Sequence, residues 1–173
     1  MPLREPARVA MRRIRDAVNE TVVLGIRNGS VYCIIDSLEG THLIGQSQLI
    51  GVPTAYELGA PGWALLAGMT DDEVSEYLPK ARFDRGVRGM NRQRLLREIT
   101  RARRKGVAVS SEDFFGGHTI AAAIREPLGA PIATLHISFP QGRYSKDLEE
   151  RCTKALVEGA AAVSASIASV EAH

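Results

Sequence analysis

Apolar residues recur at helical spacing in three stretches of this sequence. The first covers residues 6–18, where arginines separate the apolar positions. The second follows Asn91, a residue type that caps helices, and stops before Gly106, a residue type that ends them. The third follows Ser145 and keeps its apolar period as far as Val170. We expect an amphipathic helix in each stretch.

Two shorter helices are predicted between the first and second stretches. Residues 60–67 are almost entirely apolar, which suits a buried helix. Pro61 is tolerated in its first turn because an N–H group there has no helical partner. Thr70 and Glu73 have the spacing of a capping box, which predicts a further helix through Leu78.

Strand-like runs occur in two pairs, and each pair predicts a β-hairpin. Asn28-Gly29 lies in the first connection, and Asn-Gly between β-rich runs is the strongest short-range hairpin signal. The first hairpin has strands at residues 21–26 and 31–36 around the connection 27–30, and the second has strands at 116–124 and 132–140 joined by 128–131. Further strands are expected near residues 42–46 and from residue 107.

The predicted order is therefore helix, hairpin, helices, hairpin, helix. Hairpins interleaved with helices favour an antiparallel sheet flanked by helices, which is an α+β fold. A chain of 173 residues with 45% hydrophobic content is long enough for one well-buried core and short for two. We expect a lead-in helix over residues 1–20 and a single domain over residues 21–173.

Charge and cysteine content narrow the classes of function. The net charge of +2, from 22 basic and 20 acidic residues, gives no bulk electrostatic argument for nucleic acid or membrane. Cys33 and Cys152 form neither a disulfide framework nor a metal-ligand spacing, so we expect buried thiols in a reducing compartment. The first residues lack the apolar core of a signal peptide, and no run is long enough to span a bilayer. A cytoplasmic protein without cofactor or metal is expected.

The few polar residues on the second hairpin indicate a binding site. Side chains alternate faces along a strand, so His136 and Ser138 point the same way. They can converge with Thr119 of the preceding strand on one small ligand. The start of the helix at Ala60 also offers free N–H groups to an anion. This pattern predicts a small-molecule pocket.

The ordered set of motifs resembles the effector-binding domain of the IclR family of bacterial transcriptional regulators. The resemblance rests on the segments Asn19–Val22, Asn28-Gly29, Gly62–Ala67, the arginine-rich helix ending in Lys105–Ala108, Gly116–Ala122 and Ile137–Pro140. It covers nearly the whole chain. It implies a profilin-like or GAF-like fold, a small organic acid or aromatic metabolite as effector, and a homodimer or homotetramer. The family places a winged helix-turn-helix before this domain, so DNA contact is expected only through a domain absent from this chain.

The resemblance also implies which residues line the pocket. Thr119 falls where several family members have cysteine, and His136 and Ser138 fall where serines are frequent. The turn of Gly59, Ala60 and Pro61 matches the anion-facing turn of the family, although Pro61 removes one N–H donor and Trp63 replaces a frequent lysine. Ser110 and Glu112 lie in the segment where the family has an acidic run. These eight residues are the expected ligand-binding set: Thr119, His136, Ser138, Gly59, Ala60, Pro61, Ser110 and Glu112.

Two other classes of function compete with a sensor. Ser138, His136 and a carboxylate supply the groups of a small hydrolase, and His118, His136 and Glu112 supply possible metal ligands. Residues at i and i+2 of one strand lie side by side, however, and the Gly-x-Ser-x-Gly elbow is absent, so we expect no enzyme. A stand-alone binding or protein-interaction module that uses the last helix and the basic helix as docking faces remains the alternative. The arginines of residues 92–105 are expected to form a solvated helix face.

Overall fold

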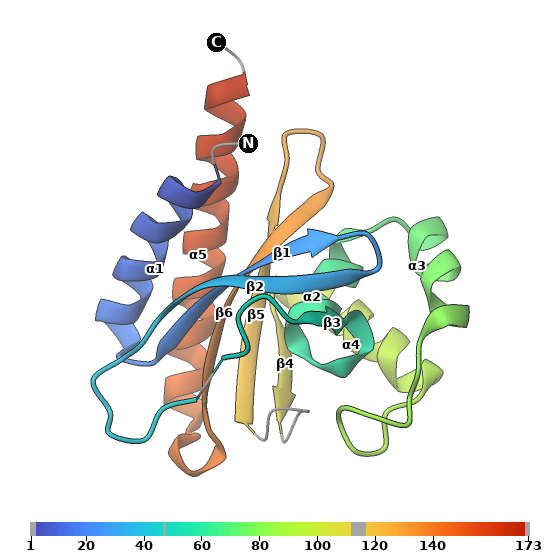
Figure 1. Ribbon diagram of the computed structural model, residues 1–173, viewed down its shortest axis with the longest axis horizontal. Coiled ribbons are helices and arrows are strands. Elements are labelled where there is room, and N and C mark those ends of the chain that lie inside the picture. The colour runs from blue at the N-terminus through green and yellow to red at the C-terminus, as the bar shows by residue number, and fades with distance from the viewer. Residues whose placement is uncertain (1–2, 47, 112–116, 172–173) are drawn as a thin grey trace.

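One six-stranded sheet, in the order β3-β2-β1-β6-β5-β4, organises the part of the chain that the structure describes (Figure 1). The structure is a computed structural model and describes residues 3–46, 48–111 and 117–171. All neighbouring strands pair antiparallel. The strands are β1 (Thr21–Asn28), β2 (Val31–Leu38), β3 (Pro53–Ala55), β4 (Ala108–Ser111), β5 (Gly117–Arg125) and β6 (Pro131–Pro140). The expected α+β class with an antiparallel sheet is confirmed.

Helices cover both faces of this sheet (Figure 1). The α-helices are α1 (Arg4–Val18), α2 (Ala60–Gly68), α3 (Asp71–Tyr77), α4 (Arg92–Lys105) and α5 (Lys146–Glu171). Short 3-10 turns are η1 (Tyr56–Leu58), η2 (Leu78–Lys80) and η3 (Gln141–Arg143). Helices α1 and α5 pack on one face around residues such as Leu24 and Ile137, while α2, α3 and α4 pack on the other around Val23 and Ala121. Alternate residues of each strand thus serve two separate cores.

The predicted helix ends are confirmed by their caps. The hydroxyl of Thr70 accepts from the N–H of Glu73, whose carboxylate accepts in return from the N–H of Thr70, which completes the capping box. Asn91 caps α4 through the N–H of Arg94. The last turn of α4 leads into Gly106, whose φ of +79° is the left-handed conformation that favours glycine.

The central hairpins agree with the sequence, with one shorter turn. Gly29, with φ of +61°, turns the chain between β1 and β2, and Asn28 still belongs to β1. The second hairpin joins β5 to β6 through a turn closed by the N–H of Glu126 and the carbonyl of Ala130. Since β1 pairs with β6, the two hairpins form the middle of one sheet.

The prediction of a strand near residues 42–46 is wrong. That segment is an irregular connection, and its apolar side chains Leu43 and Ile44 are 104% and 72% exposed. The chain joins the sheet only later, through a bridge at Ile50 and then through β3, which pairs with β2 at the sheet edge. Apolar residues were therefore a poor guide here, because they face solvent instead of a core.

Candidate functional site

A small polar cavity lies between the sheet and the start of α2. Strand β2 supplies Tyr32 and Ile34, β5 supplies Thr119, β6 supplies His136 and Ser138, and the opposite wall is formed by Gln48, Gly59 and Pro61. Its volume is about 10 Å³, which is the space of a single water molecule. Five of the eight expected residues, Thr119, His136, Ser138, Gly59 and Pro61, line this cavity.

Two hydroxyls on the floor of the cavity are bonded to one another. Thr119 and Ser138 are partners across β5 and β6, and their Oγ1 and Oγ atoms are 3.0 Å apart. One hydroxyl donates to the other, so the accepting hydroxyl keeps its own proton for a further partner. Both side chains are buried, and a ligand in the cavity can bond to this pair without breaking it.

His136 is the unsatisfied polar group of the cavity. The side chain is 2% exposed, and its Nδ1 atom has no hydrogen-bond partner among the described residues. Its neighbours across the sheet are the apolar Val23 and Ala121. Burial lowers the pKa of His136 to about 3, so the imidazole is neutral at physiological pH. A buried polar atom without a partner is costly, and such atoms often mark binding sites.

The turn before α2 forms the wall opposite the sheet. Gly59 and Pro61 face the cavity, whereas the N–H of Ala60 donates to the hydroxyl of Ser110 over 3.1 Å. Pro61 has no N–H to donate. Two of the first three residues of α2 therefore offer no donor, although a helix start normally presents several free N–H groups.

The remaining expected residues do not line the cavity. Ser110 pairs with Thr119 across β4 and β5 and borders a groove of about 280 Å³ between α4 and β4. Ala60 donates its N–H to Ser110, so the two residues shape the wall without being among those that line the cavity. Glu112 lies outside the described residues. The structure thus separates residues that the resemblance had grouped together.

Sequence reasoning missed three lining residues, and only two of them carried a signal. Tyr32 and Ile34 are two residues apart on β2, so their side chains lie on the same face. The Asn28-Gly29 turn locates this strand, and their shared face could therefore have been predicted from the hairpin. Gln48 lies in the irregular connection between β2 and β3. No periodic pattern places a residue of such a segment.

A buried carboxylate holds the turn before α2 in place. Glu57 is 2% exposed, and it accepts from the hydroxyl of Tyr77 and, over 2.9 Å, from the N–H of Arg82. The carbonyl of the same residue accepts from Nε1 of Trp63 over 3.2 Å. Tyr77 in turn accepts from the N–H of Tyr56, and burial raises the pKa of the Tyr77 hydroxyl. Trp63 and Glu57 therefore act as internal supports of the cavity wall.

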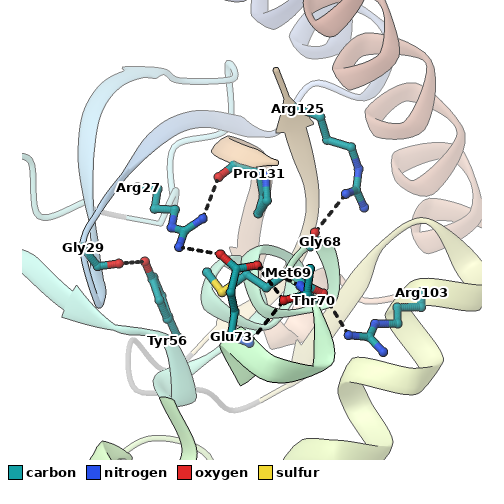
Figure 2. A network of polar contacts seen from close by, with 10 residues as sticks. All are labelled: Arg27, Gly29, Tyr56, Gly68, Met69, Thr70, Glu73, Arg103, Arg125 and Pro131. Carbon is teal, nitrogen blue, oxygen red and sulfur yellow. Dashed lines mark hydrogen bonds and ion pairs between the residues drawn. The ribbon is translucent and has the colours of Figure 1, made fainter. Parts of the chain in front are cut away.

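The far end of α2 is held by an arginine of α4. Arg103 donates to the carbonyls of Ala67 and Met69 over 3.1 and 3.0 Å, and it pairs with Asp71 over 2.7 Å. These carbonyls belong to the last turn and the C-cap of α2, where a cation complements the helix dipole. Figure 2 shows Arg103 reaching this turn from its own helix.

Two further arginines approach the same region from the sheet (Figure 2). Arg125 of β5 donates to the carbonyl of Gly68 over 3.1 Å. Arg27 of β1 lies 3.4 Å from the carboxylate of Glu73 on α3. Helix α2 is thus fixed at its C-terminal end, while its N-terminal end faces the cavity.

Two of the groups considered for metal binding, His118 and His136, lie on opposite faces of the sheet. His118 precedes Thr119 on β5, so its side chain leaves the opposite face from the cavity. There its Nδ1 lies 2.9 Å from the hydroxyl of Ser111, and its Nε2 lies 3.0 Å from Glu149. His118 and His136 therefore cannot bind one metal ion, and the described residues contain no cluster of three metal-ligating side chains.

No helix in the described part of the chain is long and apolar enough to cross a membrane.

Several arginines of residues 92–105 are engaged in local contacts. Arg94 donates to the carbonyl of Arg88, and Arg101 pairs with Glu98. Together with the contacts of Arg103, these bonds show that three of the arginines contact groups of the domain itself.

Comparisons with known proteins agree with this architecture. The model of the family described as bacterial transcriptional regulator IclR C-terminal matches residues 1–165. The transcriptional repressor AllR of Escherichia coli is 27% identical over 140 residues, which are 79% of this chain and 52% of that protein. The transcriptional regulator KdgR of Dickeya chrysanthemi is 28% identical over 144 residues, which are 82% of this chain and 47% of that protein. The chain thus spans about half the length of these curated relatives.

Solved structures show the same fold. The crystal structure of the Thermotoga maritima IclR has a TM-score of 0.90 at 25% identity, with 96% of this chain and 69% of that chain covered. The C-terminal domain of the E. coli transcriptional regulator KdgR has a TM-score of 0.83 at 26% identity, with 96% of this chain and 99% of that chain covered.

Proposed function

We propose, from the premise that this chain belongs to the IclR family of bacterial transcriptional regulators, that it binds a small effector in the cavity around His136. The observation that carries the proposal is the Nδ1 atom of His136, which is buried without a partner in a cavity that already presents two hydroxyls. A ligand supplies the partner that the protein does not. The domain is a sensor in this account, and no catalytic step is assigned to it.

The ligand contacts follow from the walls. Thr119, His136 and Ser138 provide hydrogen bonds from the sheet, and Gly59 and Pro61 close the cavity from the side of α2. The effector is a small metabolite, and the organic acids and aromatic compounds that the resemblance implies are the classes from which candidates and their uncharged analogues are drawn. Ser110 acts through Ala60 by holding the turn.

Effector binding is coupled to a change in shape because the cavity is too small as it stands. A space of about 10 Å³ does not hold a metabolite. The three polar residues of β5 and β6 are held by strand pairing on both sides, so room is gained by displacing the wall of Gln48 and Pro61. The ligand then binds the open state better than the closed state, which is the condition for a shift between them.

The change is passed on through the rest of the regulator. The matched relatives carry the designation HTH-type, and we propose that DNA binding in the full protein belongs to a winged helix-turn-helix outside this chain. We also propose a homodimer or homotetramer, in which displacement of the α2 wall alters how the domains pair. Coupling between the two sites then follows from unequal affinity of the effector for the two arrangements.

A thermal-shift screen tests the proposal. The panel contains small carboxylates, hydroxybenzoates, sugar acids and their uncharged analogues, because a ligand that binds only the folded state raises the melting temperature. A compound that stabilises the wild type but not His136→Ala supports an effector site. His42→Ala is the matched control, since His42 is half-exposed and lies outside this cavity. Stabilisation that is equal in His136→Ala and the wild type contradicts the proposal.

A further inference from the structure

The described walls of the cavity carry no formal charge. None of its described lining residues is an aspartate, glutamate, lysine or arginine, and its titratable members are Tyr32 and His136. Burial keeps His136 in its neutral form. A carboxylate that enters such a space loses its hydration without meeting a cation, and a buried charge is tolerated only when it is paired or fully hydrogen-bonded.

Two of the first three residues of α2 offer no N–H group to an anion. The N–H of Ala60 is used by Ser110, and Pro61 has none. Thr119 and Ser138 offer a single spare proton between them, because one hydroxyl donates to the other. The turn therefore lacks the set of converging N–H groups by which a helix start stabilises negative charge.

The hydrogen-bonding capacity of the His136 imidazole favours an uncharged ligand over a carboxylate. A neutral imidazole has one donor nitrogen and one acceptor nitrogen, whichever tautomer is present. A carboxylate is an acceptor only, so it can never satisfy the acceptor nitrogen. A hydroxyl or a primary amide donates as well as accepts, and it can pair with the imidazole and with the hydroxyl pair of Thr119 and Ser138 at once.

We infer that this cavity selects an uncharged metabolite bearing a hydroxyl or amide donor over the corresponding carboxylate, with His136 as the specificity-determining residue. The inference rests on the proposed function, since it names the ligand class of the same site. It separates this chain from a general organic-acid sensor, and it leaves phenols, polyols and amides as the effectors to examine.

Matched carboxylate and carboxamide pairs test the inference at pH 7. The probes are glycolate and glycolamide, pyruvate and pyruvamide, and 4-hydroxybenzoate and 4-hydroxybenzamide, each titrated by calorimetry into the wild type. We expect the amide of at least one pair to bind at least about tenfold more tightly than its carboxylate. His136→Asn keeps a donor and an acceptor near the Nδ1 position and is expected to keep the preference. His136→Leu is expected to lose amide binding.

The outcomes separate the inference from the proposed function. A carboxylate that binds more tightly than its amide, with binding lost in His136→Leu, overturns the inference and leaves the effector site intact. Equal affinities within every pair also overturn it, since charge is then not discriminated. Binding of neither member of any pair contradicts the proposed function together with the inference. Retained amide binding in His136→Leu contradicts the role of His136, and a near-native thermal transition in that variant shows that it is folded.

Discussion

The hydroxyl of Ser110 lies 3.1 Å from the backbone nitrogen of Ala60 and accepts its hydrogen bond. These residues are fifty positions apart, yet this contact decides what the start of α2 offers to the cavity. The serine takes the place that an anion occupies at many helix N-termini. The polar character of the site is therefore set as much by Ser110 as by the residues that line the cavity.

Replacement of Ser110 is expected to change ligand preference. Ser110→Ala frees the N–H of Ala60, so the affinity for a carboxylate should rise by up to about tenfold relative to its amide. The variant should also lose about 1 kcal/mol of unfolding free energy, because a buried donor loses its partner. Calorimetry and urea denaturation measure both effects. Ser75→Ala, on the exposed side of α3, is the control, and an unchanged preference in Ser110→Ala would show that this N–H does not face the ligand.

The stability of the domain should depend on pH through His136. Its pKa is about 3 in the folded state and 6.5 without burial, so below pH 6.5 the unfolded chain binds a proton here that the folded chain does not. The contribution of the neutral imidazole is complete above pH 6.5 and is lost as pH falls toward 3.

Below about pH 6, the proton that only the unfolded chain binds at His136 lowers the free energy of unfolding by about 1.4 kcal/mol for each unit that the pH falls. His136→Leu removes this dependence, so the variant should lose less stability than the wild type between pH 7 and pH 4.5. Urea denaturation at each pH measures the difference, and His42→Leu serves as control. Parallel pH profiles of the wild type and His136→Leu would mean that His136 titrates normally.

The carboxylate of Glu57 should be essential for the wall of the cavity. Glu57→Ala leaves the hydroxyl of Tyr77 and the N–H of Arg82 without their acceptor, and we expect a loss of about 3 kcal/mol of unfolding free energy. Glu57→Gln keeps the shape and one acceptor, so its loss should be smaller. Asp84→Ala removes an exposed carboxylate two residues after Arg82 and should change stability little. Equal stability of Glu57→Ala and Asp84→Ala would remove Glu57 from this role.

The arginine contacts at the end of α2 predict a smaller effect. Arg103→Met removes the donors to Ala67 and Met69, and because Arg103 is partly exposed the loss should be about 1 kcal/mol. Arg104→Met is the matched control, because the neighbouring Arg104 is an exposed arginine of the same helix. Thermal denaturation compares the two variants. A greater loss of stability in Arg104→Met would contradict the claim that Arg103 holds the end of α2.

Local signals explain why most of the fold was predictable. Asn28-Gly29, the Thr70–Glu73 capping box and the caps at Asn91 and Ser145 act within a few residues, and each is found where its pattern indicates. The period of two along β6 also placed His136 and Ser138 on one face. Such features depend on backbone geometry that the neighbouring sequence dictates.

Long-range contacts explain what was not predictable. Leu43 and Ile44 resemble strand residues, but no described strand pairs with them, and the chain meets β2 only later, at Ile50 and Pro53–Ala55. The bond from Ala60 to Ser110 and the approach of Gln48 join segments far apart in the chain. Neither contact leaves a periodic pattern in the sequence, so the true lining of the cavity emerged only from the fold.

The most direct test of the central claim is calorimetric titration of the best-stabilising compound of the screen into three proteins. The account predicts one ligand per wild-type chain, at least about tenfold weaker binding to His136→Leu, and unchanged binding to His42→Leu. Binding to His136→Leu with wild-type affinity would contradict the claim that the cavity around His136 is the effector site.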